Sequence, residues 1–299
     1  MAFIRNFVVP ALLLAAPAAA YANVITDWDE KAVSIVQGNA PAPPPLLGGP
    51  AGGVRIMTAV HIAMFEAVNA IEQRYESYKL GTKPVHPASS QQAAAAAAAA
   101  TVLTKMLPDS AAKVKQAQDS YLAGIENGEA KDSGVKLGEE VALKVVALRA
   151  EDGADKVNVY RPVTQPGVYV QTVPTVSWEY ADMPPWVMTS PSQFRPPPPV
   201  VLTSEQWAKD YNEIKDLGEK NSTKRTPRQT EDAQFWVSGG PTIYQPIPRQ
   251  IVISKNMSVV DSARFMAVVA AAQVGRHHRG VRCQVQVRVL ASCYGNSQW

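Results

Sequence analysis

The chain has 299 residues, of which 18% are charged and 46% belong to the hydrophobic set, and its formal net charge is +3. This composition excludes a disordered chain and supplies enough apolar side chains for a large core. The charged residues after Gly275 are four arginines. Without these four positive charges, the net charge of +3 becomes −1 for the rest of the chain. The bulk charge therefore gives no basis for a nucleic-acid or membrane-surface role.

Residues 1–22 have the three parts of a secretory signal peptide. A short basic start precedes the apolar run 7–20, and Ala-Tyr-Ala at 20–22 is a small-x-small cleavage site. The run is too short to span a bilayer, and Pro10 and Pro17 interrupt it, which disfavours an uncleaved anchor. We expect an exported protein, periplasmic or extracellular, with no membrane span after cleavage.

The first helix of the mature chain is predicted from Thr26, a candidate N-cap, to about Gln37. The Pro- and Gly-rich stretch 40–53 predicts a loop. From Arg55 to about Tyr75, apolar residues recur at spacings of three and four, which indicates an amphipathic helix with one buried face.

An alanine run, Ala93–Ala100, lies within a stretch that ends at Pro108. Alanine is the best helix former, and its small side chain lets neighbouring helices approach closely. Low-complexity disorder is the competing interpretation. The apolar pattern continues through Val102 and Leu103, however, and this favours a buried helix.

Two more helices are predicted, over Asp109–Asn127 and Glu129–Glu151, with Gly128 between them. Because the joining loops are short, these helices should pack antiparallel in a bundle.

Regular periodicity is then lost over 155–202, which is rich in proline and aromatic residues. A linker or an extended recognition segment is one interpretation of such a composition. Long loops with many aromatic residues are more often functional, so we expect an irregular arm that packs over the bundle.

Helices resume after the arm. Thr203 with Gln206 forms a predicted capping box for a helix that ends at Gly218. Another helix is predicted over 226–237, with proline at its first position. The last is predicted from Ser258 to Val274. The expected fold class is therefore all-α: a helical bundle with a long Pro/aromatic-rich irregular segment.

Few residues are candidates for chemistry. Of the four histidines, His61 lies beside an apolar stripe, close to Glu66 and Asn69, and is expected to be a packed, hydrogen-bonded residue rather than a ligand or base. His86 belongs to no recognised motif. The carboxylate pairs on later helices have no neighbouring base or oxyanion donor, so they are interpreted as solvated helix faces. These pairs are Asp210 with Glu213, and Glu231 with Asp232.

The C-terminal residues offer a basic cluster, Arg276-His277-His278-Arg279. Adjacent residues on a helix point about 100° apart, so they rarely share one ion. Cys283 and Cys293 are not interpreted as a disulfide pair. The sequons at Asn221 and Asn256 have meaning only in a eukaryotic secretory pathway.

Several segments form a pattern when taken together. They are Arg55–Asn69, Ser190–Pro196, Asn212–Gly218, Arg225–Trp236 and Ser262–Ala267. The pattern resembles bacterial vanadium-dependent haloperoxidase-like proteins, which belong with the type-2 phosphatidic acid phosphatases, and the resemblance covers about 23–274. It implies an all-α bundle that holds phosphate or vanadate and acts on a small-molecule substrate, by phosphoester hydrolysis or by vanadate-dependent halide oxidation.

The resemblance also implies three motifs that this sequence does not contain: Lys-x-x-x-x-x-x-Arg-Pro, then Pro-Ser-Gly-His, then Ser-Arg followed some residues later by His. In such sites cationic side chains and N–H groups neutralise an oxyanion. We therefore predict no catalytic, cofactor-binding or metal-binding residue in this chain. Vanadate is expected only in a full-length parent.

The stretch 275–299 suggests why the motifs are missing. Codons can be chosen for it such that deleting one base at Gly275 gives a reading that begins Asp-Ala-Ile-Ile-Ala-Val-Phe-Asp-Ala-Lys-Tyr-Lys-Tyr-Glu-Phe-Trp-Arg-Pro. In that reading Gln284, Ala291 and Ser292 stand where the motif's lysine, arginine and proline belong. We hypothesise a frameshift, genuine or a sequencing error, that leaves an inactive N-terminal portion. The alternative is a native tail on a non-catalytic exported helical binding protein.

Overall fold

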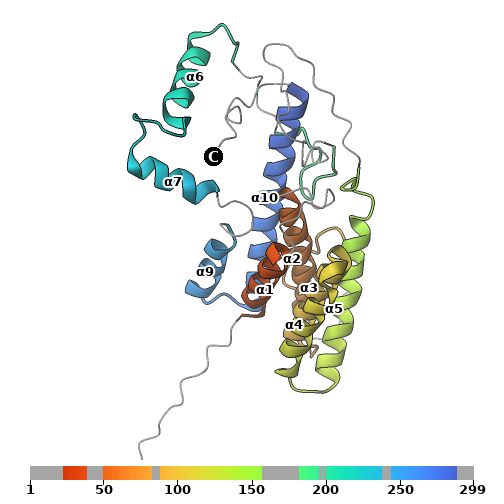
Figure 1. Ribbon diagram of the computed structural model, residues 1–299. Coiled ribbons are helices and arrows are strands. Elements are labelled where there is room, and N and C mark those ends of the chain that lie inside the picture. The colour runs from red at the N-terminus through yellow and green to blue at the C-terminus, as the bar shows by residue number, and fades with distance from the viewer. Residues whose placement is uncertain are drawn as a thin grey trace, which may run out of the picture.

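The computed structural model describes residues 23–38, 50–82, 88–156, 182–194, 197, 200–237 and 244–287 (Figure 1). The regular elements of these residues are all helical, so the all-α prediction is confirmed over this part of the chain. In chain order they are α1 (Val24–Gly38), α2 (Pro50–Glu72), α3 (Gln91–Met106), η1 (Pro108–Ser110), α4 (Ala111–Ala123), α5 (Glu129–Leu148), α6 (Glu205–Gly218), α7 (Pro227–Val237), α9 (Pro246–Ser254) and α10 (Val259–Val287). The predicted signal peptide and His86 lie outside the described residues.

α2 is the central helix of the bundle. It packs against α1, α3, α5 and α10, and nearly all its residues from Gly52 to Ile71 are buried. Among the described helices it alone is long and apolar enough, over Gly52–Glu72, to match a membrane-spanning segment by composition. Because 94% of that window is buried inside the protein, its composition suits a core helix equally well.

The alanine run forms a buried helix, as predicted. Ala93–Ala100 are each at most 1% exposed, and α3 lies along α5. The two helices come closest at two glycines of α5, Gly134 and Gly138. A Cβ atom placed on Gly138 would lie 2.3 Å from the carbonyl oxygen of Ala94. Small residues on both helices therefore set the distance between them.

Side-chain caps fix the starts of α7 and α10, where the sequence predicts them. Thr226 accepts the backbone N–H of Gln229 at 3.2 Å, and the Gln229 side chain accepts the N–H of Thr226 at 2.9 Å. Pro227 is the first residue of α7. Ser258 accepts the N–H of Asp261 at 3.2 Å. These bonds satisfy N–H groups that a helix start leaves unpaired.

Two other predicted caps are wrong. Ser204 rather than Thr203 caps α6, because its hydroxyl accepts a first-turn N–H at 3.1 Å. α1 begins at Val24, directly after Asn23 and two residues before Thr26. Ser, Thr and Asn all cap helices well, so the residue type does not choose between neighbouring candidates.

Three predicted helix bounds also need correction. α2 begins at Pro50, inside the predicted loop, because proline is tolerated in the first turn of a helix. The predicted helix 109–127 divides into η1 and a shorter α4 that ends at Ala123. α5 ends at Leu148 rather than Glu151.

The sequence patterns predict neither α9 nor the distal part of α10. α9 is short and begins at Pro246, so it has no apolar stripe of the usual length. α10 continues from the predicted end at Val274 to Val287. Arginine and glutamine are good helix formers, and extending an existing helix is easier than starting one.

Of the predicted irregular arm 155–202, the structure describes 182–194 and short flanking stretches, and these form no helix before α6. Met183 and Trp186 are each 1% exposed and belong to the core, so this portion packs on the bundle as predicted. Other aromatic residues of the arm lie outside the described residues, namely Tyr160, Tyr169, Trp178 and Tyr180.

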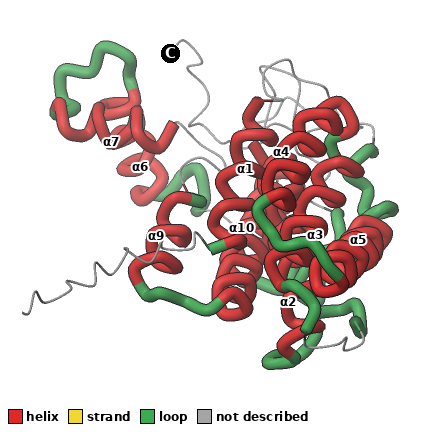
Figure 2. The backbone as a smooth tube through the Cα atoms, turned by 90° about the horizontal axis from the view of Figure 1, so that it is seen from below, coloured by secondary structure: helices red, strands yellow, loops and turns green. Residues whose placement is uncertain are grey.

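α6 and α7 form a pair of consecutive helices, set at a large angle to each other, that stands away from the bundle on the side opposite α4 and α5 (Figures 1 and 2). We call it the α6–α7 arm. The guanidinium of Arg225 donates hydrogen bonds to the carbonyl oxygens of Leu217 and Glu219, at 2.5 and 2.9 Å, and so closes the end of α6. No residue of α6 is buried.

Candidate functional site

A cavity of about 570 Å³ lies between α2, α10 and the segment 182–194. α2 contributes Ile62 and Phe65 to its lining, and α10 contributes a small-residue face that includes Ala267 and Ala271. Its volume is within the range of about 300–1,000 Å³ that is common for small-molecule sites. Since the lining is mainly apolar, the few polar groups in it decide what chemistry it supports.

Those polar groups are Glu76, Tyr78 and Arg264. The guanidinium carbon of Arg264 lies 4.6 Å from the centroid of the Tyr75 ring, a cation–π contact. The described lining residues thus include one positive charge, on Arg264, and one negative charge, on Glu76.

Buried Glu66 holds the chain segment that carries Tyr78. Its carboxylate accepts hydrogen bonds from the hydroxyls of Ser77 and Thr82, at 2.6 and 2.9 Å, and from the backbone N–H of Tyr78. Several donors on one carboxylate offset the cost of burying its charge. Glu66 therefore acts as an anchor for this wall of the cavity.

Tyr78, which lines the cavity, packs against buried Trp186, with ring centroids 6.3 Å apart and ring planes inclined by 39°. The Tyr78 hydroxyl donates to the carbonyl oxygen of Trp186, and the guanidinium of Arg149 lies 4.5 Å from the Trp186 ring centroid. Asp152 accepts from Arg149 at 3.0 Å and from Arg55 at 2.8 Å. Burial raises the pKa of Tyr78 to about 12, and burial lowers the pKa of Arg149, an effect that Asp152 opposes. At neutral pH the Tyr78 phenol is therefore un-ionised.

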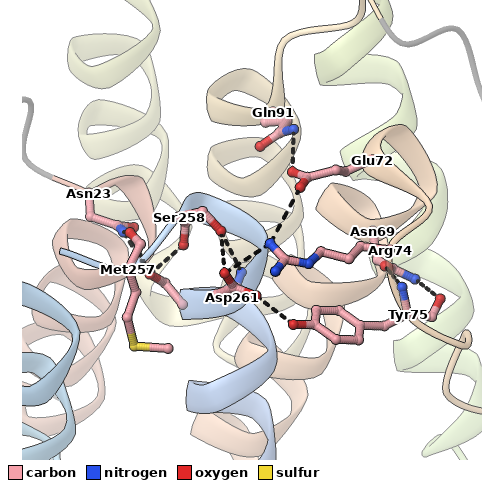
Figure 3. A network of polar contacts seen from close by, with 10 residues as sticks. Asn23, Asn69, Glu72, Arg74, Tyr75, Gln91, Met257, Ser258 and Asp261 are labelled. Atoms are coloured by element: carbon pink, nitrogen blue, oxygen red, sulfur yellow. Dashed lines mark hydrogen bonds and ion pairs between the residues drawn. The ribbon is translucent and has the colours of Figure 1, made fainter. Parts of the chain in front are cut away.

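A polar network fixes the start of α10 against the chain that follows α2 (Figure 3). Asp261 accepts from the Tyr75 hydroxyl at 2.5 Å, from Arg74 at 3.0 Å and from Ser258 at 2.8 Å. The hydrogen bond from Tyr75, followed by that from Ser258, holds the pKa of Asp261 below its usual range. The side-chain amide of Asn69 holds the backbone of Tyr75: it donates to the Tyr75 carbonyl oxygen at 2.7 Å and accepts the Tyr75 N–H at 2.9 Å.

The buried histidine belongs to a different cluster. His61 Nε2 lies 2.8 Å from one oxygen of Asp29, and Arg249 donates to the other oxygen at 2.6 Å. His61 is the packed, hydrogen-bonded residue that the sequence predicts, but its partner is neither Glu66 nor Asn69. Residues five apart on a helix point about 140° apart, so Glu66 faces another neighbour.

This cluster joins α1, α2 and α9 inside the core. The side chains of Asp29 and His61 are fully buried, and Nδ1 of His61 has no hydrogen-bond partner. Because solvent reaches neither side chain, the pair stabilises the packing of the helices and does not form a substrate site. The sequence gives only a weak signal for this cluster, since Asp29 and His61 lie on different predicted helices and Arg249 lies on α9, which the sequence does not predict.

The two predicted carboxylate pairs lie on the α6–α7 arm, away from the cavity. Glu213, Glu231 and Asp232 are exposed and Asp210 is half-buried. Asp232 pairs with Arg228 of the preceding turn at 3.1 Å. Their interpretation as solvated helix faces is therefore confirmed.

The remaining candidates lie in the tail or on the surface. Arg276, His277, His278, Arg279, Cys283 and Gln284 lie on α10, but their side chains are outside the described part of the structure. Ala291, Ser292 and Cys293 lie outside it entirely. Asn221 and Asn256 are exposed, and Asn256 adopts a left-handed φ of 45° between α9 and α10.

The described lining of the cavity has few groups that suit a vanadate or phosphate ion. Such an ion needs several fixed cations and N–H donors around it. The lining contains one cationic side chain, Arg264, and also the carboxylate of Glu76, which would repel an anion. Nor do the described residues contain a group of three or more His, Cys, Asp or Glu side chains placed to hold a metal ion.

No protein-family model matches this sequence, and no curated protein matches it. Among solved structures, the chain is similar to one described as the first bacterial vanadium-dependent iodoperoxidase, with a TM-score of 0.67 and 15% sequence identity. The match covers 89% of this chain and 69% of that one. At this identity the likeness shows the fold alone. The fold of this chain is the all-α fold of the vanadium-dependent haloperoxidases, in agreement with the resemblance seen in its sequence.

Proposed function

We propose that this chain is the inactive N-terminal helical portion of an exported vanadium-dependent haloperoxidase or type-2 phosphatidic acid phosphatase-like protein. The observation that carries the proposal is the mismatch between fold and site. The fold is that of a vanadate-binding enzyme, but the described cavity lining has one guanidinium, one carboxylate and otherwise almost only apolar groups. Vanadate and the small-molecule substrate would belong to a full-length parent.

The proposal includes a frameshift at Gly275 as the cause of the missing motifs. Its support is the alternative reading of 275–299, which gives an apolar helical sequence and the Lys-x-x-x-x-x-x-Arg-Pro motif together. In the chain as given, α10 runs through this point to Val287. The apolar pattern of the alternative reading also favours a helix, so we infer that the two readings would differ here mainly in their side chains.

Resequencing the gene around codon 275, followed by expression of both readings, tests the proposal. We expect a single-base change to open a downstream frame that encodes Pro-Ser-Gly-His. The reframed protein should then catalyse bromide oxidation with vanadate or hydrolyse a phosphomonoester, whereas the chain as given should do neither. Turnover by the chain as given, or the lack of any such frame, would contradict the proposal.

A second candidate is a non-catalytic exported binding protein. The exposed apolar side chains of the α6–α7 arm favour it, because soluble proteins seldom expose large apolar patches without a binding role. It becomes the better account if no downstream frame is found.

A further inference from the structure

The turn between α4 and α5 contains an Asn-Gly pair, Asn127-Gly128. Both residues are exposed. The backbone nitrogen that follows an asparagine can attack the asparagine side chain, and glycine hinders this attack least because it has no Cβ atom. The reaction also requires a free nitrogen and a reachable side-chain carbonyl, and both of these depend on the fold.

The attacking nitrogen is free at this site. Among the described residues, no group accepts a hydrogen bond from the backbone N–H of Gly128. Apart from the adjacent residues, no atom lies within 4 Å of the position that a Cβ atom would occupy there. The φ angle of Gly128 is 146°, which side chains other than glycine rarely permit. The turn therefore requires glycine, and its nitrogen is open to solvent.

Two other asparagines provide a contrast within the same chain. Asn221 and Asn256 are also exposed and also lie outside the helices. The N–H that follows Asn221 donates to the carbonyl oxygen of Glu219 at 3.1 Å, and the N–H that follows Asn256 donates to that of Val252 at 3.2 Å. At these two sites the nitrogen must give up a hydrogen bond before it can attack.

A lysine contacts the side chain that would be attacked. The ammonium of Lys131 donates to the side-chain oxygen of Asn127 at 2.9 Å and to the backbone carbonyl oxygen of Ile125 at 3.2 Å. The first hydrogen bond polarises the amide and stabilises negative charge on that oxygen during attack, as a donor of an oxyanion hole does. The second keeps the ammonium in place.

We propose that Asn127 is a site of spontaneous deamidation, promoted by the free N–H of Gly128 and the ammonium of Lys131. Hydroxide removes the proton from the Gly128 nitrogen, and this nitrogen forms a bond to Cγ of Asn127. The bond from Cγ to Nδ2 breaks, and Nδ2 takes a proton from water and leaves as ammonia. Water then opens the cyclic imide at either carbonyl carbon, which gives aspartate or isoaspartate. No oxidant or reductant is needed.

The product adds one negative charge just before α5. A carboxylate at position 127 can pair with Lys131, and negative charge is favourable near a helix N-terminus. The isoaspartate form also lengthens the backbone by one methylene. This extra atom precedes the first hydrogen bond of α5, from the N–H of Asp132 to the carbonyl oxygen of Gly128. The fold can therefore accommodate the change within the turn, and the proposal is independent of any enzymatic activity.

The test is incubation of the purified chain at mildly alkaline pH, both folded and in urea, with peptide mass spectrometry to follow each asparagine. Folding should slow deamidation at Asn221 and Asn256 by at least about tenfold, because the native hydrogen bonds hold their attacking nitrogens. It should not slow deamidation at Asn127. An Asn127 that is stable in the folded chain, or that folding protects as much as the other two, would overturn the proposal.

Two variants test the lysine. In the folded chain, Lys131→Met should slow deamidation at Asn127 by roughly threefold or more, a smaller effect than in an enclosed oxyanion hole because solvent screens the site. Lys131→Arg should keep the wild-type rate, since a guanidinium also donates. In urea all three proteins should react equally. An unchanged rate in folded Lys131→Met, or the same slowing in urea, would overturn the role of the lysine. Circular dichroism checks that both variants keep the fold.

Discussion

At the scale of single residues, the most consequential feature is the ionic cluster in the core. Asp29 and His61 are both fully buried, and Arg249 reaches Asp29 from a helix more than two hundred residues away in the sequence. Burying charges is costly unless each finds a partner, so removing one member leaves the others uncompensated. The carboxylate of Asp29 therefore links α9 to α1 and α2, in addition to the apolar contacts of Val252 in the core.

Replacing Asp29 by alanine should lower the free energy of unfolding by about 3 kcal/mol, because Arg249 and His61 lose their shared partner in the core. Urea denaturation followed by circular dichroism measures the change. Asp232→Ala is the matched control, since its ion pair with Arg228 is exposed and should contribute less than about 1 kcal/mol. Similar losses in the two variants would contradict the role given to the buried cluster.

A second residue-scale prediction concerns pH. The pKa of Asp261 is lower in the folded protein than in an unfolded chain, chiefly because of the hydrogen bond from Tyr75. A depressed carboxyl pKa stabilises the fold above the unfolded value, about 3.9, and this contribution is lost as the pH falls through the folded pKa. Tyr75→Phe should therefore lower the melting temperature at pH 7.

The difference in melting temperature between wild type and Tyr75→Phe should be constant well above pH 4 and should shrink as the pH falls below about 3.9, because the unfolded chain then takes up the proton. Thermal unfolding at a series of pH values measures it. A difference that stays constant over this range would show that the tyrosine acts only through packing.

At the scale of helices, apolar periodicity predicts most of the fold. Local patterns predict the helices α2 and α3, the latter from its alanine run. They also predict the N-caps at Thr226 and Ser258. α9 escapes prediction because nine residues carry too short a pattern and two of them are prolines. Its place depends on a tertiary contact, Arg249 to Asp29, that no local rule contains.

The contact between α3 and α5 gives an element-scale prediction. Gly138→Ala should destabilise the protein by about 2 kcal/mol, because the new methyl group would overlap the backbone of α3 at Ala94 and Ala98. Alanine favours a helix over glycine by about 1 kcal/mol, so the overlap must exceed that gain. Thermal unfolding measures the change.

Gly124→Ala is the control for this substitution. Gly124 has a right-handed helical conformation, and a methyl group there would meet its nearest neighbour at an ordinary distance of 3.5 Å. It should be neutral or slightly stabilising. A neutral Gly138→Ala would mean that α3 and α5 can separate without cost, which contradicts close packing as the organising contact.

At the scale of the whole molecule, the sequence predicts the fold better than the site. Motif resemblance points to the haloperoxidase fold, which the structural comparison supports despite 15% identity. The cavity could not be predicted, because its lining joins residues from α2, the irregular segment and α10 that share no sequence pattern. Likewise, the partner of His61 lies on another helix, whereas sequence reasoning considers neighbours on the same one.

The central proposal is that this chain, whose fold is similar to that of a vanadium-dependent iodoperoxidase, does not itself bind vanadate. Titration of the purified chain with orthovanadate, followed by ⁵¹V nuclear magnetic resonance, tests it most directly. We predict no saturable binding at vanadate concentrations up to about 1 mM. A dissociation constant of about 1 mM corresponds to a binding free energy of only about 4 kcal/mol. Saturable binding at micromolar vanadate, competed by phosphate, would contradict the claim.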